Sequence, residues 1–128
     1  MANTPRDGDL PTFVYHHFTI SLAPQTGVTP AGTPIAFDKT PVILPSTPVL
    51  GITEFDVAAI GGDVTLSLAG IAQVITGGAV AVGDAITFDT TSRAITAATG
   101  NQIAGRALNA ATAAGSKIRI LFSREGTT

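Results

Sequence analysis

The alternation of apolar and polar residues predicts a chain built from short β-strands. Residues 63–68, 85–88 and 117–122 each place an apolar side chain at every second position. Successive side chains of a strand point to opposite faces, so each segment predicts a strand with one buried face. The expected inward residues are Val64, Leu66, Leu68, Ile86, Phe88, Ile118, Ile120 and Phe122.

Residues 79–89 predict a hairpin, with a strand on each side of a turn at Gly83 and Asp84. Glycine allows a tight bend, and an aspartate side chain accepts backbone N–H groups. A return strand is expected at residues 93–97. Residues 71–75 and 102–108 predict further strands, with Gly105 at a point where a neighbouring strand approaches closely.

The other segments are less regular. Residues 1–11 are polar and carry three prolines or glycines, which predicts a flexible N-terminal arm. Residues 24–48 are Pro-rich and predict an extended loop with at most one edge strand. Such a loop either lies along a partner or is an ordinary surface loop, and the sequence supports both. Residues 109–116 are Ala-rich and predict one helical turn, and residues 123–128 predict a polar tail.

Residues 12–22 predict a strand with aromatic residues on both faces. One face is apolar enough for a core, and the other faces solvent or a partner. The core face would hold Val14, His16, Phe18, Ile20 and Leu22, and the opposite face would hold Phe13, Tyr15, His17, Thr19 and Ser21.

These elements predict an all-β fold. Short strands separated by turn residues, without helical periodicity, are typical of a small antiparallel β-barrel or sandwich. We expect a β-tulip-like outline with an extended N-terminal arm and a Pro-rich loop. Residues 12–122 would form a single β-domain.

The composition of the chain is low in charged residues. The 128-residue chain is 45% hydrophobic but only 12% charged, with a net charge of −2. A surface with so few charges suggests that other protein covers part of it. No basic field is available for nucleic acid. The uncharged run between Asp63 and Asp84 alternates as strands do, which argues against a transmembrane helix. We therefore expect neither nucleic acid nor a membrane as a partner.

The motifs that resemble chemical sites fail at their decisive positions. Residues 78–83 have the glycine spacing of a phosphate-binding loop, but Asp84 and Ala85 replace the required Lys and Ser or Thr. His16 and His17 are adjacent on a strand and point to opposite faces, so they cannot easily share a metal. Asp84 and Asp89 would be about 16 Å apart along a strand. We therefore predict no enzyme, no catalytic residue, no metal, no cofactor and no small-molecule substrate.

Residues 51–122 resemble the small capsid decoration, or cement, proteins of tailed bacteriophages. The order and spacing of several short motifs carry this resemblance. They are Leu50-Gly51-Ile52 with Asp56-Val57-Ala58, the strand at 62–70 that ends in glycine, Ala81-Val82-Gly83-Asp84-Ala85-Ile86, Ile95-Thr96 with Gly100, Ile103-Ala104-Gly105-Arg106-Ala107-Leu108, and Ile118-Arg119-Ile120. The longer Pro-rich lead before Gly51 departs from the compact members of that family.

The resemblance implies a non-enzymatic virion protein on the outer surface of an expanded capsid. It implies that the major capsid protein is the partner, and that the protein binds as a homotrimer at three-fold and quasi-three-fold positions. Another phage structural component, such as a tail-tube, fibre-base or head-completion protein, is the alternative, and a small enzyme or ligand-binding barrel with a polar pocket is a third. The expected capsid or subunit contacts are Thr4, Pro5, Phe13, Tyr15, His17 and Thr19.

Overall fold

The computed structural model describes residues 17–127, which form nine β-strands and no helix. The predicted all-β fold is confirmed. The strands are β1 (His17–Leu22), β2 (Pro34–Ala36), β3 (Val49–Thr53), β4 (Gly62–Ser67), β5 (Gly70–Ile75), β6 (Ala85–Phe88), β7 (Ala94–Thr96), β8 (Gln102–Ala107) and β9 (Lys117–Thr127). Accordingly, no helix in the described part of the chain is long and apolar enough to cross a membrane.

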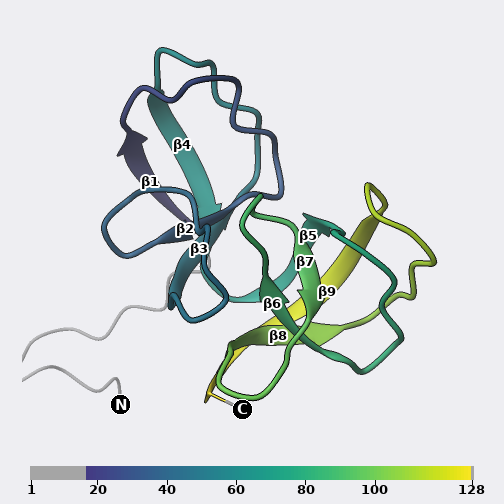
Figure 1. Cartoon of the computed structure of the whole chain (residues 1–128). Helices are drawn as coiled ribbons and strands as arrows, with labels where there is room; N and C mark the ends of the chain where they lie inside the picture. The colour runs from purple at the N-terminus through teal and green to yellow at the C-terminus, as the bar shows by residue number, and fades with distance from the viewer. Residues whose placement is uncertain (1–16, 128) are drawn as a thin grey trace, which may run out of the picture.

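The strands form two antiparallel sheets that occupy different parts of the molecule (Figure 1). The first sheet has the order β1-β4-β3-β2, and the second has the order β5-β9-β8-β6-β7. The chain therefore completes one sheet before it begins the other. The described strands do not close into a barrel, so the arrangement is sandwich-like.

The period-two pattern correctly identified the buried faces of several strands. In β9, Ile118, Ile120 and Phe122 are all at most 5% exposed, and they alternate with exposed residues. Ile86 and Phe88 of β6 are buried in the same core. Burial of one face supplies the hydrophobic stabilisation that makes each short strand persist.

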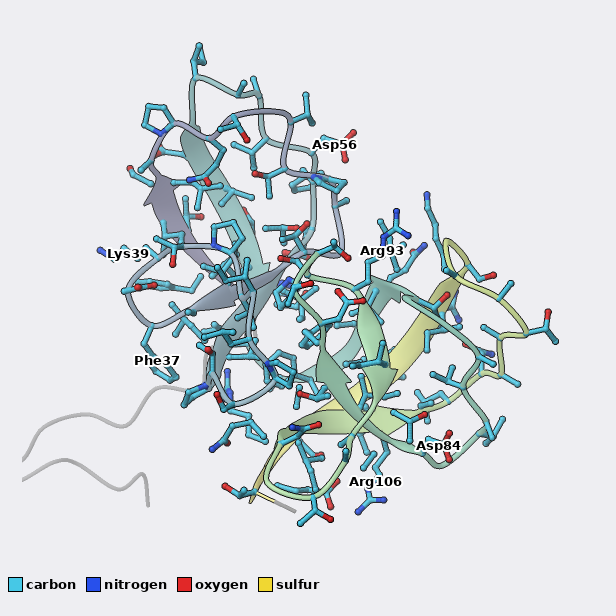
Figure 2. The ribbon with its side chains drawn as sticks, in the orientation of Figure 1. Phe37, Lys39, Asp56, Asp84, Arg93 and Arg106 are labelled. Atoms are coloured by element: carbon cyan, nitrogen blue, oxygen red, sulfur yellow. The ribbon has the colours of Figure 1, made fainter. Side chains whose placement is uncertain are left out.

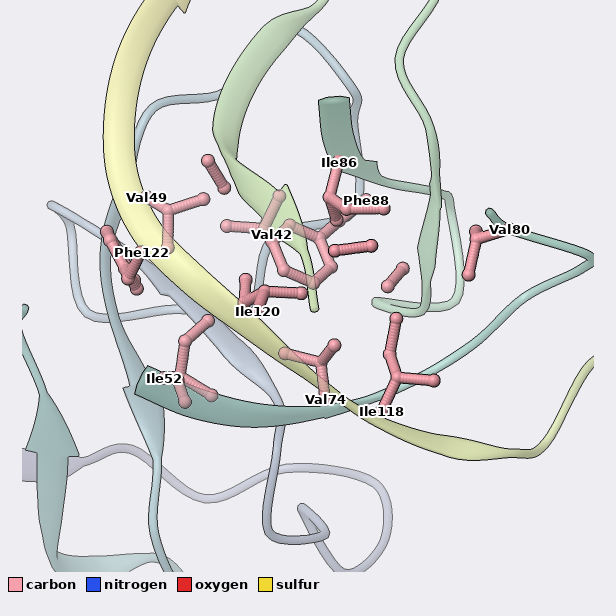
Figure 3. Packing of buried hydrophobic residues seen from close by; sticks show 14 of the residues in the cluster. Val42, Val49, Ile52, Val74, Val80, Ile86, Phe88, Ile118, Ile120 and Phe122 are labelled. Carbon is pink, nitrogen blue, oxygen red and sulfur yellow. The ribbon is translucent and has the colours of Figure 1, made fainter. Parts of the chain in front are cut away.

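The larger core is built from both halves of the chain (Figure 3). Val42, Val49 and Ile52 come from the first half, yet they pack against the residues that line the inner side of the second sheet. Those residues include Val74, Ile86, Phe88, Ile118, Ile120 and Phe122. A smaller cluster is formed by strand residues of the first sheet with Val57 of the β3–β4 connection, and comprises Ile20, Leu22, Ile35, Val57, Val64 and Leu66.

The Pro-rich segment is packed against the chain's own second sheet. The Pro45 carbonyl accepts hydrogen bonds from the backbone N–H of Gln102 (2.9 Å) and the hydroxyl of Thr87 (3.0 Å). The Val42 carbonyl accepts one from the hydroxyl of Ser92 (2.6 Å). Proline lacks a backbone donor but keeps its carbonyl, and in these three contacts the segment supplies the acceptor.

Two local predictions are wrong. Residues 79–82 are not a strand paired with β6; instead Val80 forms an isolated bridge with Ala111. That bridge holds residues 109–116 extended and bent, so the predicted helical turn is absent. A short apolar run cannot reveal by its side chains which distant backbone it will pair with, and here the partner lies 31 residues away in sequence.

The last strand extends further than the sequence suggests. β9 runs to Thr127, so residues 123–127, predicted to form a polar tail, belong to a strand. Gln102 and Ile103 of β8 pair with Thr127 and Gly126. The Arg124 guanidinium lies over the Phe122 ring, 4.5 Å from its centroid, and donates hydrogen bonds to the carbonyls of β3. Residues 123–127 therefore stay in the strand through backbone pairing with β8 and the contacts of Arg124, and not through burial of alternate side chains.

Phe18 shows a limit of the alternation rule. It stands opposite the fully buried Leu66 in the β1–β4 register, so it lies on the core-facing side as predicted. Its side chain is nevertheless 49% exposed, because β1 is the edge strand of its sheet. The alternation pattern shows on which face of the strand a residue lies, but not whether other parts of the protein bury that face.

Gly105 lies at a close approach between β8 and β9. A Cβ atom added at this position would clash with the backbone carbonyl of Leu121. The pairing of β8 with β9 also shifts register between Ile103 and Gly105. Only a residue without a side chain fits this contact without moving the strand.

We predict that Gly105→Ala lowers the free energy of unfolding by about 1–3 kcal/mol, as overpacking against fixed backbone does. Gly78→Ala is the matched control, since a Cβ there meets nothing within 4 Å. Urea denaturation of both variants measures the difference. Equal stability of Gly105→Ala and the wild type would contradict the close approach.

Asp89 organises the turn between β6 and β7. Its carboxylate accepts the backbone N–H groups of Thr91 (2.9 Å) and Arg93 (3.0 Å) and the hydroxyl of Thr91 (2.8 Å). Partial burial alone would raise the pKa of Asp89. The hydrogen bonds from Arg93 and Thr91, with the Arg93 charge, outweigh burial and lower that pKa below its usual value.

We predict that Asp89→Asn costs about 1 kcal/mol of unfolding free energy at pH 7, through weaker hydrogen bonds. The lowered folded-state pKa means that the ionised group stabilises the fold above the unfolded-state pKa, and that this contribution is lost as the pH falls through the folded-state pKa. The difference in unfolding free energy between the wild type and Asp89→Asn should therefore shrink towards pH 3. Urea titrations at pH 7 and pH 3 test this, and a gap independent of pH would refute it.

Candidate interaction surfaces

β1 presents a polar face and an open edge. Its outer positions are His17, Thr19 and Ser21, and all three are exposed. Nδ1 of His17 lies 2.9 Å from Oε2 of Glu54, and the hydroxyls of Thr19 and Thr65 are 3.4 Å apart. β1 pairs with β4 on one side only, so its other edge has no strand partner among residues 17–127. An open edge can accept a strand from another chain.

Of the expected contact residues, only two can be placed. His17 and Thr19 lie on this outer face of β1. Thr4, Pro5, Phe13 and Tyr15 lie outside the described residues, as does the predicted N-terminal arm. The assignment of these six residues to capsid or subunit contact therefore stays a prediction.

Gly83 and Asp84 lie in the turn that leads into β6. Gly83 has a φ of +87°, a conformation that favours glycine. The Asp84 carboxylate accepts the N–H of Ala81 (2.9 Å) and the hydroxyl of Thr96 in β7 (3.1 Å). These contacts tie the turn to the edge of the second sheet, which is a structural task and not a chemical one.

The outer face of the second sheet is mixed apolar and basic. Ile71 of β5 stands opposite Leu121 of β9, and Leu121 stands opposite Arg106 of β8. Ile71 is 62% and Leu121 45% exposed. Lys117 and Arg119 also project from this face of β9.

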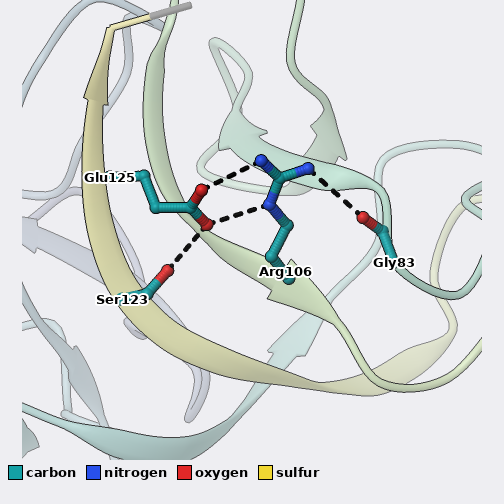
Figure 4. Close-up of polar contacts among 4 residues, drawn as sticks. All are labelled: Gly83, Arg106, Ser123 and Glu125. Carbon is teal, nitrogen blue, oxygen red and sulfur yellow. Dashed lines mark hydrogen bonds and ion pairs between the residues drawn. The ribbon is translucent and has the colours of Figure 1, made fainter.

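Arg106 is held by a bidentate ion pair (Figure 4). Its Nε and Nη2 atoms each lie 2.9 Å from a carboxylate oxygen of Glu125, and Nη1 donates to the Gly83 carbonyl. The Ser123 hydroxyl donates to the same carboxylate. Hydrogen bonding to Arg106 lowers the pKa of Glu125 below its usual value, so the pair stays charged at neutral pH.

Two grooves accompany these faces. One, of about 280 Å³, lies between the sheets and includes Glu54, Ser67, Ile71, Gln73 and Lys117 in its lining. The other, of about 360 Å³, runs between residues 25–33 and the turn at residues 91–93. Both are open and mixed in polarity.

The grooves offer no chemistry that the structure can identify. Within residues 17–127, no three His, Cys, Asp or Glu side chains gather as a metal site would require. His17, the one histidine in that range, is paired with Glu54 and not with a serine. Every buried side-chain nitrogen or oxygen there has a hydrogen-bond partner, so none is left pointing into a groove for a ligand.

Sequence reasoning missed the exposed apolar residues. Phe37, Phe55 and Ile60 lie in loops and are more than 60% exposed, and Phe37 projects outward in Figure 2. The signal was a large apolar residue within a polar, Gly- or Pro-rich loop. Leu121 was also readable, since it falls between Ile120 and Phe122 on the face that alternation leaves outside. Such positions are typical of surfaces that contact other protein.

Comparison with known proteins adds a family and a fold. A family model described as phage cement protein matches residues 14–122. The crystal structure of the head fibre gp8.5 N base of bacteriophage phi29 is similar, with a TM-score of 0.66 and 18% sequence identity over 88% of this chain and 98% of that one. At that identity the likeness shows the fold alone.

No curated protein sequence matches the chain. The family model, however, spans both sheets from before β1 to Phe122 in β9. On this evidence, the chain belongs to the phage cement protein family.

Proposed function

We propose that this protein decorates the outer surface of an expanded tailed-phage capsid and stabilises it by binding across neighbouring major capsid subunits. The match of the cement-protein model to residues 14–122 carries the proposal. The surface agrees with it, since only 12% of the residues are charged and several large apolar side chains are exposed. The protein acts by adhesion, without catalysis or a cofactor.

The contact is proposed to run through the N-terminal segment and β1. Residues 1–11 precede β1 in the sequence. The outer face of β1 holds His17 and Thr19, and its other edge has no strand partner among residues 17–127. An extended segment that adds to a neighbour's sheet gains main-chain hydrogen bonds as well as side-chain contacts. Association as a homotrimer at three-fold and quasi-three-fold positions would place one such segment over each neighbouring subunit.

A second candidate is the base of a fibre attached to the head. The fold similarity to the head fibre base of phage phi29 favours it over tail-tube or head-completion roles. Both candidates place the protein on the virion. They differ in whether its main task is to stabilise the shell or to carry another protein outward.

We predict saturable co-sedimentation with expanded capsids that lack the protein. Saturation is expected at about one copy per major capsid subunit, because a trimer at every three-fold and quasi-three-fold position supplies one copy for each subunit. The decorated shells should also resist heat better, because a ligand that binds only the intact shell stabilises it. Binding without added heat resistance would favour the fibre-base role. No binding to expanded shells would refute a capsid-surface role.

We also predict that deletion of residues 1–11 weakens capsid binding and leaves the β-fold intact. The deleted residues precede both sheets, so the thermal unfolding midpoint should not change. Co-sedimentation and circular dichroism on the same preparation separate the two effects. Unchanged affinity would remove the N-terminal arm from the contact.

A further inference from the structure

Charge is distributed unevenly between the two sheets. Residues 17–69, which contain the first sheet, hold four acidic side chains and a single lysine. Residues 70–127, which contain the second sheet, hold five lysines and arginines and three acidic side chains. Because each stretch forms its own sheet, the nearly neutral chain has an acidic part and a basic part.

Three of these five cations, Arg106, Lys117 and Arg119, project from one face, which we call the basic face and define as the outer side of β5, β9 and β8. Cross-strand rows place Ile71 beside Leu121 and Arg106, and Gln73 beside Arg119. Arg106 already has a partner in Glu125. Lys117 and Arg119 are exposed and form no ion pair with any described residue. Two free cations therefore border an exposed apolar centre.

The acidic counterpart, called the acidic face, is the outer side of β1 and β4 with the residue that follows β3. Asp63 stands beside Ser21, and Glu54 donates its backbone N–H to the carbonyl of Thr65. The remaining outer side chains there are hydroxyls and His17, so this face holds no lysine or arginine. Lys39, the one lysine of residues 17–69, projects from a loop elsewhere (Figure 2).

We propose that the basic face of one copy of this chain docks on the acidic face of a second copy. Opposite charges then meet around Ile71 and Leu121, whose exposed surface is removed from water. Each copy has one face of each kind, so copies associate head to tail and a closed assembly can form. This inference rests on the proposed association of copies on the shell, and it names the surfaces through which that association occurs.

The two faces do not satisfy each other within one chain. They border the same groove, with Glu54 on one side and Lys117 on the other, yet no ion pair joins them. Lys117 and Arg119 therefore have no ion-pair partner among the described residues, and Glu54 is paired only with His17 of its own face. A contact between copies would pair Lys117 and Arg119 of one copy with Glu54 and Asp63 of the next.

The first test compares two charge reversals in the full-length protein by sedimentation velocity. Arg119→Glu should weaken self-association at least about tenfold, because it sets an acid against the acidic face. Lys39→Glu changes the net charge equally but lies off both faces, so it should associate as the wild type does. Wild-type association should also weaken as salt rises, through screening. Equal self-association of Arg119→Glu and Lys39→Glu would overturn the proposal.

A charge swap gives the sharper test. Lys117→Glu/Arg119→Glu reverses the basic face, and Glu54→Lys/Asp63→Lys reverses the acidic face. Each variant alone should be monomeric, while their equimolar mixture should associate again, because each reversed face then meets a face of opposite charge. Thermal melts confirm that both variants fold. A mixture that stays monomeric, or a wild type that is monomeric at all concentrations, would refute the inference.

The outcome can be separated from that of the proposed function. Wild-type protein that saturates capsids but never self-associates would refute this inference and leave capsid decoration standing. Protein that self-associates through these faces but does not bind expanded capsids would support this inference and refute capsid decoration. Binding of duplex DNA to the basic face, abolished by Lys117→Glu/Arg119→Glu, with no self-association, would assign that face to another partner and overturn the proposal.

Discussion

The structure depends on the packing of the branched aliphatic side chains of Val42, Val49 and Ile52, from the first half of the chain, into the core of the second sheet. Val42, Val49 and Ile52 together close the inner side of that sheet. Each such side chain contributes about 1.5–3 kcal/mol when it leaves water. Without them the second sheet would expose an apolar face, and the first sheet would keep only its smaller cluster. This shared core is what joins the two sheets into one structure.

Polar contacts reinforce the same junction. The Pro45 and Val42 carbonyls accept hydrogen bonds from the second sheet, and Arg124 at the end of the chain donates to Val49 and Leu50 in β3. Burial lowers the pKa of Arg124, but a guanidinium stays charged at any physiological pH. Arg124 thus connects the last strand to the first sheet, although the sequence pattern alone would place this charged side chain in solvent.

The predictable part of the fold follows one physical rule. Where one face of a strand is buried and the other is exposed, the period of two is visible, as in β9 up to Phe122. The rule fails where pairing, and not burial, decides the structure, as in the bridge of Val80 to Ala111. The surfaces were harder still: the sequence shows which residues are charged, but only the register brings Ile71, Leu121 and Arg106 into one row.

The position of β9 in its sheet has a mechanical consequence. This longest strand lies between β5 and β8 and is antiparallel to both. A pull along its axis loads the hydrogen bonds of two ladders in shear, and they must break together. A pull across the sheet would instead open bonds one after another from an edge. In the proposed role across capsid subunits, internal pressure would stretch the protein, and its resistance would depend on the direction of the strain as well as on its affinity.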